Sequence, residues 1–164
     1  MSVILQRITT EYIAHEDRIR LNGACPGGER IVLWLTHRLL EKLIPALNRC
    51  LEKGSGITNQ SNTLHRFAQE AANATHIGHP AVTVPLDSPT WLVCSIDIAV
   101  NTQKILLTFK NLQQDNAKLY FTESQLRQWL NMLFRLYQQA GWRLDVWPSW
   151  IKIQDTEQTA RSVH

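Results

Sequence analysis

Three of the six histidines are the first residues in this chain that could do chemistry. His76 and His79 have the spacing His-x-x-His, and His65 precedes them. A zinc site needs three or four convergent ligands, and no cysteine lies near these histidines in sequence. The neighbouring residues are typical of loops, so we interpret the pair as solvated side chains. The sequence predicts no metal site.

The other reactive residue types also lack the partners that catalysis requires. Cys25 lies in the loop sequence ACPGG, but no histidine or local charge in its neighbourhood would lower the pKa of the thiol. The glycines between Gly23 and Gly28 do not match a phosphate-binding pattern, and they lead into a strand instead of a helix. We therefore expect no cofactor and favour a protein that is not an enzyme.

Basic residues form one candidate binding surface. Four of them fall within about 60° of one another on a predicted helix, opposite its leucine face, when each residue advances by 100°. Two further arginines point to one side of a preceding strand. This set consists of Arg38, Lys42, Arg49 and Lys53 on the helix and Arg18 and Arg20 on the strand. It is either an ordinary solvated face or a contact surface for an acidic partner, an anion or nucleic acid.

Aromatic residues near the end of the chain form the second candidate. Trp147, Trp150 and Ile151 follow Gly141, beyond the repeated part of the sequence described below. Tryptophan is enriched at protein interfaces. We predict that these three residues stay partly exposed and bind a protein partner or a second copy. The alternative is a terminal strand that closes the core.

The elements that must position these residues follow from an internal repeat. When the sequence is aligned with itself at an offset of 86 positions, Ile19 matches Ile105, Leu33 matches Leu119 and Leu40 matches Leu126. The same alignment matches Thr36 with Thr122, and each threonine lies where a helix N-cap is expected. The sequence therefore predicts an α+β fold of two tandem β-β-β-α units.

Alternating and helical hydrophobic patterns define the elements of each unit. The expected strands span 4–14, 17–22 and 30–35 in the first unit, and 91–100, 104–110 and 118–121 in the second. An amphipathic helix follows each third strand, and Gly54 and Gly141 end the two helices. Pro45 should bend the first helix without breaking it, because the apolar pattern continues past the proline.

A single unit of this size is marginally stable, so we expect both units to form one pseudo-twofold domain with antiparallel sheet. The predicted boundaries are 1–54 and 91–141 for the units, 55–90 for a polar connector with a short helix near 64–74, 142–153 for the terminal strand or docking segment, and 154–164 for a flexible tail.

Composition supports a folded, reduced protein. Hydrophobic residues make up 44% and charged residues 19%, values that exclude disorder along the whole chain. No apolar run is long enough for a signal peptide or a membrane-spanning helix. The three cysteines are widely spaced and odd in number, which favours free thiols. We expect a cytoplasmic location and no membrane partner.

The leading hypothesis is a non-catalytic protein-interaction, assembly or adaptor module that binds a protein partner or itself. The first alternative is a nucleic-acid-binding module that uses the basic residues, although a net charge of +3 is small for that role. The second alternative is a small enzyme or ligand-binding protein with its site between the two units.

Overall fold

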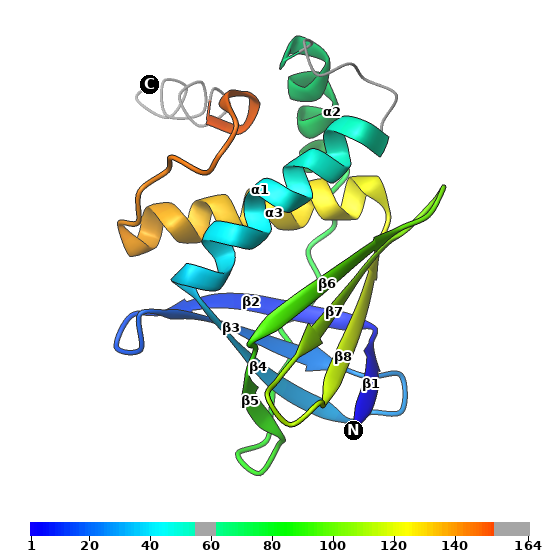
Figure 1. Cartoon of the computed structure of the whole chain (residues 1–164), viewed down its shortest axis with the longest axis vertical. Helices are drawn as coiled ribbons and strands as arrows, with labels where there is room; N and C mark the ends of the chain where they lie inside the picture. Colours follow the sequence, from blue (N-terminus) through cyan, green and yellow to red (C-terminus); the bar gives the residue numbers. More distant parts are fainter. Residues whose placement is uncertain (55–61, 153–164) are drawn as a thin grey trace. The chain divides into compact units, whose positions relative to one another are not determined.

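The computed structural model describes residues 1–54 and 62–152, which form an α+β protein (Figure 1). The elements in chain order are β1 (Ser2–Leu5), β2 (Arg7–Ile13), β3 (Arg18–Ala24), β4 (Arg30–Thr36), α1 (His37–Gly54), α2 (Asn62–Ala74), β5 (Thr90–Leu92), β6 (Ser95–Val100), β7 (Ile105–Lys110), β8 (Asn116–Phe121) and α3 (Glu123–Ala140). A short helical turn follows at 149–152.

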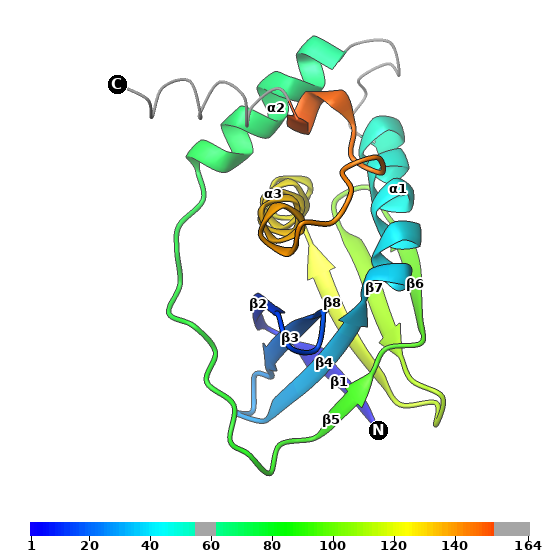
Figure 2. The same cartoon turned by 90° about the vertical axis from the view of Figure 1, so that its left-hand side faces the viewer.

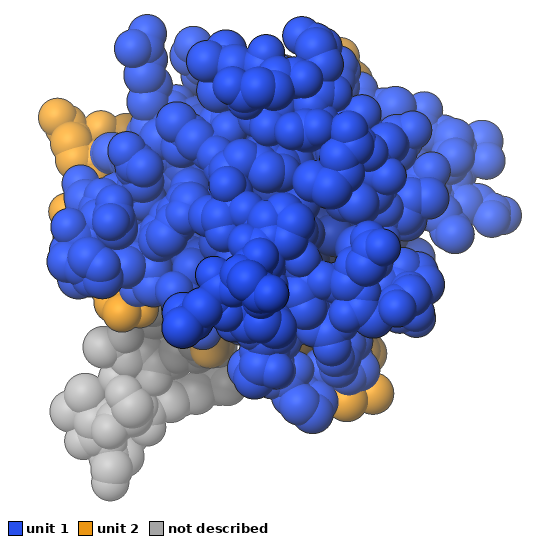
Figure 3. Space-filling view, turned by 90° about the horizontal axis from the view of Figure 1, so that it is seen from below, with its two compact units in different colours: residues 1–43, 78–122 blue, residues 44–77, 123–164 orange. Residues whose placement is uncertain are grey.

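The chain divides into two compact units, which Figure 3 distinguishes by colour. Unit 1 comprises residues 1–43 and 78–122 and contains all the strands named above. Unit 2 comprises residues 44–77 and 123–164, of which 55–61 and 153–164 are not described. These units do not coincide with the two predicted repeats, because each contains segments from both halves of the sequence.

Unit 1 contains two four-stranded sheets with the orders β1-β8-β7-β6 and β2-β3-β4-β5. Strands β2, β3 and β4 form one antiparallel meander, and β6, β7 and β8 form another. Each sheet is completed by a parallel strand from the other half of the sequence. Strand β1 pairs with β8, and β5 pairs with β4 (Figure 1, Figure 2).

The expectation of a single first strand in each repeat was therefore wrong. The first of these strands divides at Gln6 into β1 and β2, and the second divides at Val93 and Cys94 into β5 and β6. The amide of Val93 donates to the Trp34 carbonyl at 3.0 Å, whereas the next amide, Cys94, donates to Lys110 at 2.8 Å. The chain thus changes sheets between two residues, and the fold contains parallel as well as antiparallel pairs.

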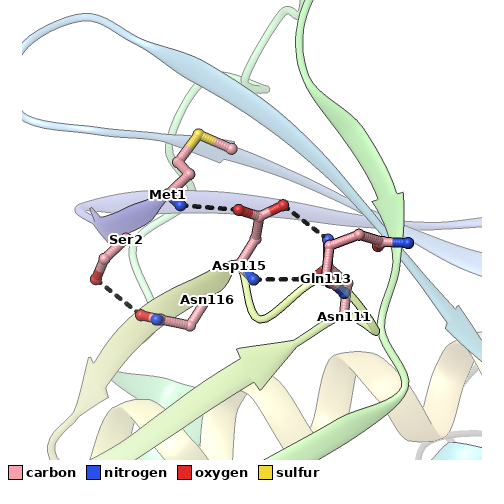
Figure 4. Close-up of polar contacts among 6 residues, drawn as sticks. All are labelled: Met1, Ser2, Asn111, Gln113, Asp115 and Asn116. Carbon is pink, nitrogen blue, oxygen red and sulfur yellow. Dashed lines mark hydrogen bonds and ion pairs between the residues drawn. The ribbon is translucent and has the colours of Figure 1, made fainter.

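The start of β1 is held by polar contacts with the turn between β7 and β8 (Figure 4). The Met1 amino group lies 2.8 Å from Asp115 Oδ1, and the Ser2 hydroxyl donates to Asn116 Oδ1 at 2.8 Å. Asn111 Nδ2 donates to the other oxygen of Asp115. The hydrogen bond from the Met1 amino group, followed by that from Asn111, lowers the pKa of Asp115. These contacts secure the parallel pairing of β1 with β8.

The core of unit 1 comes from alternate residues on the strands. Its buried apolar side chains include Leu5, Ile19, Leu21, Leu33, Leu35, Leu107, Phe109, Leu119 and Phe121. Strand β1 packs closely against β3 at Gly23. A Cβ atom built at this glycine would lie only 2.8 Å from Leu5 Cδ2. Gly23 therefore leaves the space that Leu5 occupies.

The helices follow the sequence signals closely. The amide of Leu39 donates to Thr36 Oγ1 at 3.1 Å, which confirms Thr36 as the N-cap of α1. The helix runs unbroken through Pro45, as expected. Gly141 follows α3 with a φ of 71°, the left-handed conformation expected of a glycine that ends a helix. Helix α2 forms where the connector was predicted to contain a short helix.

The segment after α3 differs from the prediction. Residues 142–152 contain turns and the helical turn at 149–152, so a terminal strand was wrong for the described part of this segment. The predicted flexible tail, 154–164, lies outside the described residues. Across residues 1–54 and 62–152, no helix has both the length and the apolar character needed to cross a bilayer.

The close approach at Gly23 gives a first prediction. Gly23→Val should lower the free energy of unfolding by about 1–3 kcal/mol, because the new side chain must displace Leu5 or Ile31. Gly27→Ala is the control: a Cβ atom there meets nothing within 4 Å, and we expect a change within about 0.5 kcal/mol. Urea denaturation measures both values, and equal effects would contradict this packing.

Candidate functional site

The predicted tryptophan surface is buried inside unit 2. The exposed fractions of Trp147, Trp150 and Ile151 are 3%, 1% and 1%. The expectation that these side chains stay partly exposed was therefore wrong. Their burial follows from the aromatic residues of α3: the Trp147 ring meets Phe134 and Tyr137 edge to face, each at 5.3 Å between centroids. The segment after α3 thus closes a core, although it does so without a strand.

The predicted basic residues have different surroundings. Arg38, Lys42, Arg49 and Lys53 on α1 are all exposed. On β3, Arg18 is half-buried, and Arg20 forms an ion pair with Glu11 at 2.7 Å. The Arg20 guanidinium also lies 6.0 Å from the centre of the Trp34 ring. The Arg20 guanidinium is therefore already paired with a carboxylate within the sheet. The exposed basic side chains of α1 are the better candidates for an anionic ligand.

A buried polar cluster in unit 2 joins α2 and α3. Arg127 is almost fully buried, and its Nη2 donates to His65 Nδ1 at 3.2 Å and to Glu123 Oε1 at 3.2 Å. Gln69 is fully buried and its Nε2 donates to the Arg127 carbonyl at 2.7 Å. The Trp150 ring stacks on His65 at 5.5 Å, with the Arg127 guanidinium 5.3 Å from its centre. We call these five residues the arginine cluster.

The hydrogen bonds of the arginine cluster determine the protonation of His65. An arginine can only donate, so Nδ1 of His65 carries a lone pair and Nε2 carries the hydrogen. Burial first, and the neighbouring Arg127 guanidinium second, lower the pKa of His65, while Glu52 and Glu123 act in the opposite direction. Burial likewise lowers the pKa of Arg127, and Glu123 opposes this effect. His65 is therefore neutral beside a buried cation.

The arginine cluster positions helices and lacks the features of a catalytic site. It contains no nucleophile, and its only carboxylate is the partly exposed Glu123. Sequence reasoning missed this cluster, but a signal was present. Arg127, Leu130 and Phe134 share one helix face, so a charged residue occupied a core position. The spacing of His65 and Gln69 places them together on α2.

His76, His79 and Cys25 are not members of the arginine cluster. Within 1–54 and 62–152, no group of three or more histidine, cysteine or acidic residues could hold a metal ion. His76 and His79 are exposed. Burial raises the pKa of the Cys25 thiol; Glu29 adds to this effect and Arg30 opposes it. A raised pKa disfavours the reactive thiolate.

Helix α2 exposes apolar residues on the side away from the arginine cluster. Leu64 and Phe67 are 51% and 54% exposed, and Ala71 and Ala74 are exposed beside them. At 100° per residue these four positions fall within about 80°, and this face lies roughly opposite His65 and Gln69. We call Leu64, Phe67, Ala71 and Ala74 the α2 outer face. Sequence reasoning did not identify it.

Comparison of the chain with protein-family models, curated proteins and solved structures found no match. Function is therefore inferred from the chain's own side chains.

The lowered pKa of His65 gives a second prediction. In the window below about pH 6.5, the unfolded chain binds a proton at His65 that the folded protein does not bind, so stability should fall as the pH falls. His65→Asn should make the free energy of unfolding less dependent on pH across that window. His79→Asn, at an exposed position, is the control and should keep the wild-type slope. Identical slopes in all three proteins would contradict a buried neutral His65.

Proposed function

We propose that this protein is a non-catalytic protein-interaction module that binds through the α2 outer face. The supporting observation is the inverted polarity of α2. This helix buries His65 and Gln69 while it exposes Leu64 and Phe67. A helix that served only to cover a core would turn its large apolar residues inward. Exposed apolar side chains gathered on one face are typical of a binding surface.

The contacts behind α2 fix which face is outward. Gln69 Nε2 donates to the Arg127 carbonyl at 2.7 Å, and Gln128 Nε2 donates to the Ala72 carbonyl at 2.9 Å. Rotation of α2 to bury Phe67 would break these bonds and leave buried polar groups without partners, which costs about 1–3 kcal/mol per group. The outward position of Phe67 is therefore part of the stable fold.

We also propose that the scaffold is an internal duplication with pseudo-twofold symmetry. An offset of 86 takes both ends of α1, at 37 and 54, to both ends of α3, at 123 and 140. The same offset takes the start of β4, at 30, to the start of β8, at 116. The reciprocal exchange of β1 and β5 is the arrangement that two equivalent halves would give.

Nucleic-acid binding is the second candidate function. It is favoured by one observation, the four exposed basic side chains on a single face of α1. Binding of this kind would release counterions and would weaken steeply as salt is added. We propose it only as the alternative, because Glu41 and Glu52 flank this face and reduce its charge.

The third prediction separates these functions. Chemical cross-linking of the purified protein, alone and in an extract of its source organism, should capture a complex with a second copy or another protein. Phe67→Ser should reduce that complex by about tenfold or more, as expected for a central aromatic contact. Leu112→Ser removes an apolar side chain that is even more exposed than Phe67, at 77%, from the turn between β7 and β8, and should leave the complex unchanged.

Circular dichroism should show that Phe67→Ser remains folded, since exposed substitutions usually change stability by no more than about 0.5 kcal/mol. A complex that Phe67→Ser does not reduce would contradict binding through the α2 outer face. Salt-sensitive retention on DNA or RNA that is lost in Arg38→Glu/Lys42→Glu, without any protein complex, would support the alternative instead.

A further inference from the structure

We propose that the α2 outer face binds a second copy of this chain, with the two α2 helices packed antiparallel about a twofold axis. This inference rests on the proposed function, because it names the partner of the same face. It follows from the order of large and small residues along α2 and from the charges beside them.

The large residues of the α2 outer face precede the small ones. Leu64 and Phe67 occupy the first half of the helix, and Ala71 and Ala74 occupy the second half. An antiparallel pair centred near Gln69 places each Phe67 opposite Ala71 of the second copy and each Leu64 opposite Ala74. A parallel pair would place two Phe67 rings together at one end and leave a gap between alanines at the other. Close packing therefore favours the antiparallel arrangement.

The spacing of these residues suits contact between two helices. Positions 64, 67, 71 and 74 are separated by three, four and three residues, which is the spacing of the apolar seam in paired helices. Alanine lets two helix backbones approach closely, so the Phe67 ring can fill the space above Ala71 of the second copy. The seam extends for about 15 Å along each helix, because ten steps of 1.5 Å separate positions 64 and 74.

The charges beside the seam are also self-complementary. Arg66 and Glu70 lie on the same flank of α2, with Arg66 Nε and Glu70 Oε1 separated by 3.9 Å. In a twofold antiparallel pair, Arg66 of each copy comes close to Glu70 of the other. The Arg66 guanidinium lies 5.6 Å from the centre of the Phe67 ring, which brings this charge to the border of the seam. The dimer therefore contains two contacts beside the seam, and each of them joins an arginine of one copy to a glutamate of the other.

A helix pair of this size predicts a weak dimer. Stable interfaces usually bury about 1,200–2,000 Å² in total, and a seam of three helical turns supplies only part of that area. We therefore expect a dissociation constant in the micromolar range. Sedimentation equilibrium can follow the resulting equilibrium between monomer and dimer.

The fourth prediction uses charge exchange in the full chain. Sedimentation equilibrium should show a wild-type dimer, and Arg66→Glu or Glu70→Arg alone should weaken it by about tenfold, because each change creates like-charge contacts. The double variant Arg66→Glu/Glu70→Arg should return to within about twofold of wild type. An equimolar mixture of the two single variants should form a heterodimer. Circular dichroism should show that all variants remain folded.

Ala71→Glu provides a second variant on the seam, because it keeps a good helix former and should abolish the dimer. A chain that stays monomeric at high micromolar concentration overturns the inference, as does a dimer unaffected by Arg66→Glu and Ala71→Glu. Failure of the double variant to recover would exclude the antiparallel pair. In any of these cases, a different protein captured by wild type and lost in Phe67→Ser would leave the proposed function standing.

Discussion

The exchange of β1 and β5 between the sheets is the constraint on which unit 1 depends. A three-stranded meander is marginal alone, and without a fourth strand the outer edge of β4 or β8 would leave backbone donors and acceptors unpaired. Strand β1 covers the edge of β8, and β5 covers the edge of β4. Each meander therefore needs a segment from the other half of the sequence. The lack of a Cβ atom at Gly23 makes room for Leu5 of β1, and the contact of Asp115 with Met1 holds the start of this strand.

A different constraint organises unit 2. The buried Arg127 guanidinium requires polar neighbours, and α2 supplies His65 and Gln69 on its inner side. Because those polar residues occupy the inner face, Leu64 and Phe67 lie on the outer face. Exposure of apolar residues on α2 is thus a consequence of the buried charge on α3. The binding surface that we propose and the arginine cluster are two sides of one helix.

The locally encoded parts of the fold were predictable from the sequence. Thr36 marks the start of α1, Gly141 marks the end of α3, and alternation identifies β3 and β7. The points where the chain changes sheets were not predictable. They lie at Gln6 and between Val93 and Cys94, and none of these residues is a glycine or proline that would signal a bend. Their position depends on pairing with strands far away in sequence. The exposure of Trp147 and Trp150 was misjudged for a similar reason: composition does not reveal which α3 residues cover them.

Native-state hydrogen exchange of four backbone amides tests the strand exchange most directly. The amides of Gln6, Val93 and Cys94 donate where the chain changes sheets, and the amide of Asn116 donates to Met1 beside the start of β1; the donor–acceptor distances are 2.8, 3.0, 2.8 and 3.0 Å in that order. If the crossings hold unit 1 together, these amides should exchange only through the same opening that exposes the central strands β3 and β7. Rapid exchange of these four amides, while β3 and β7 stay protected, would show that the meanders are stable without the exchanged strands and would contradict this account.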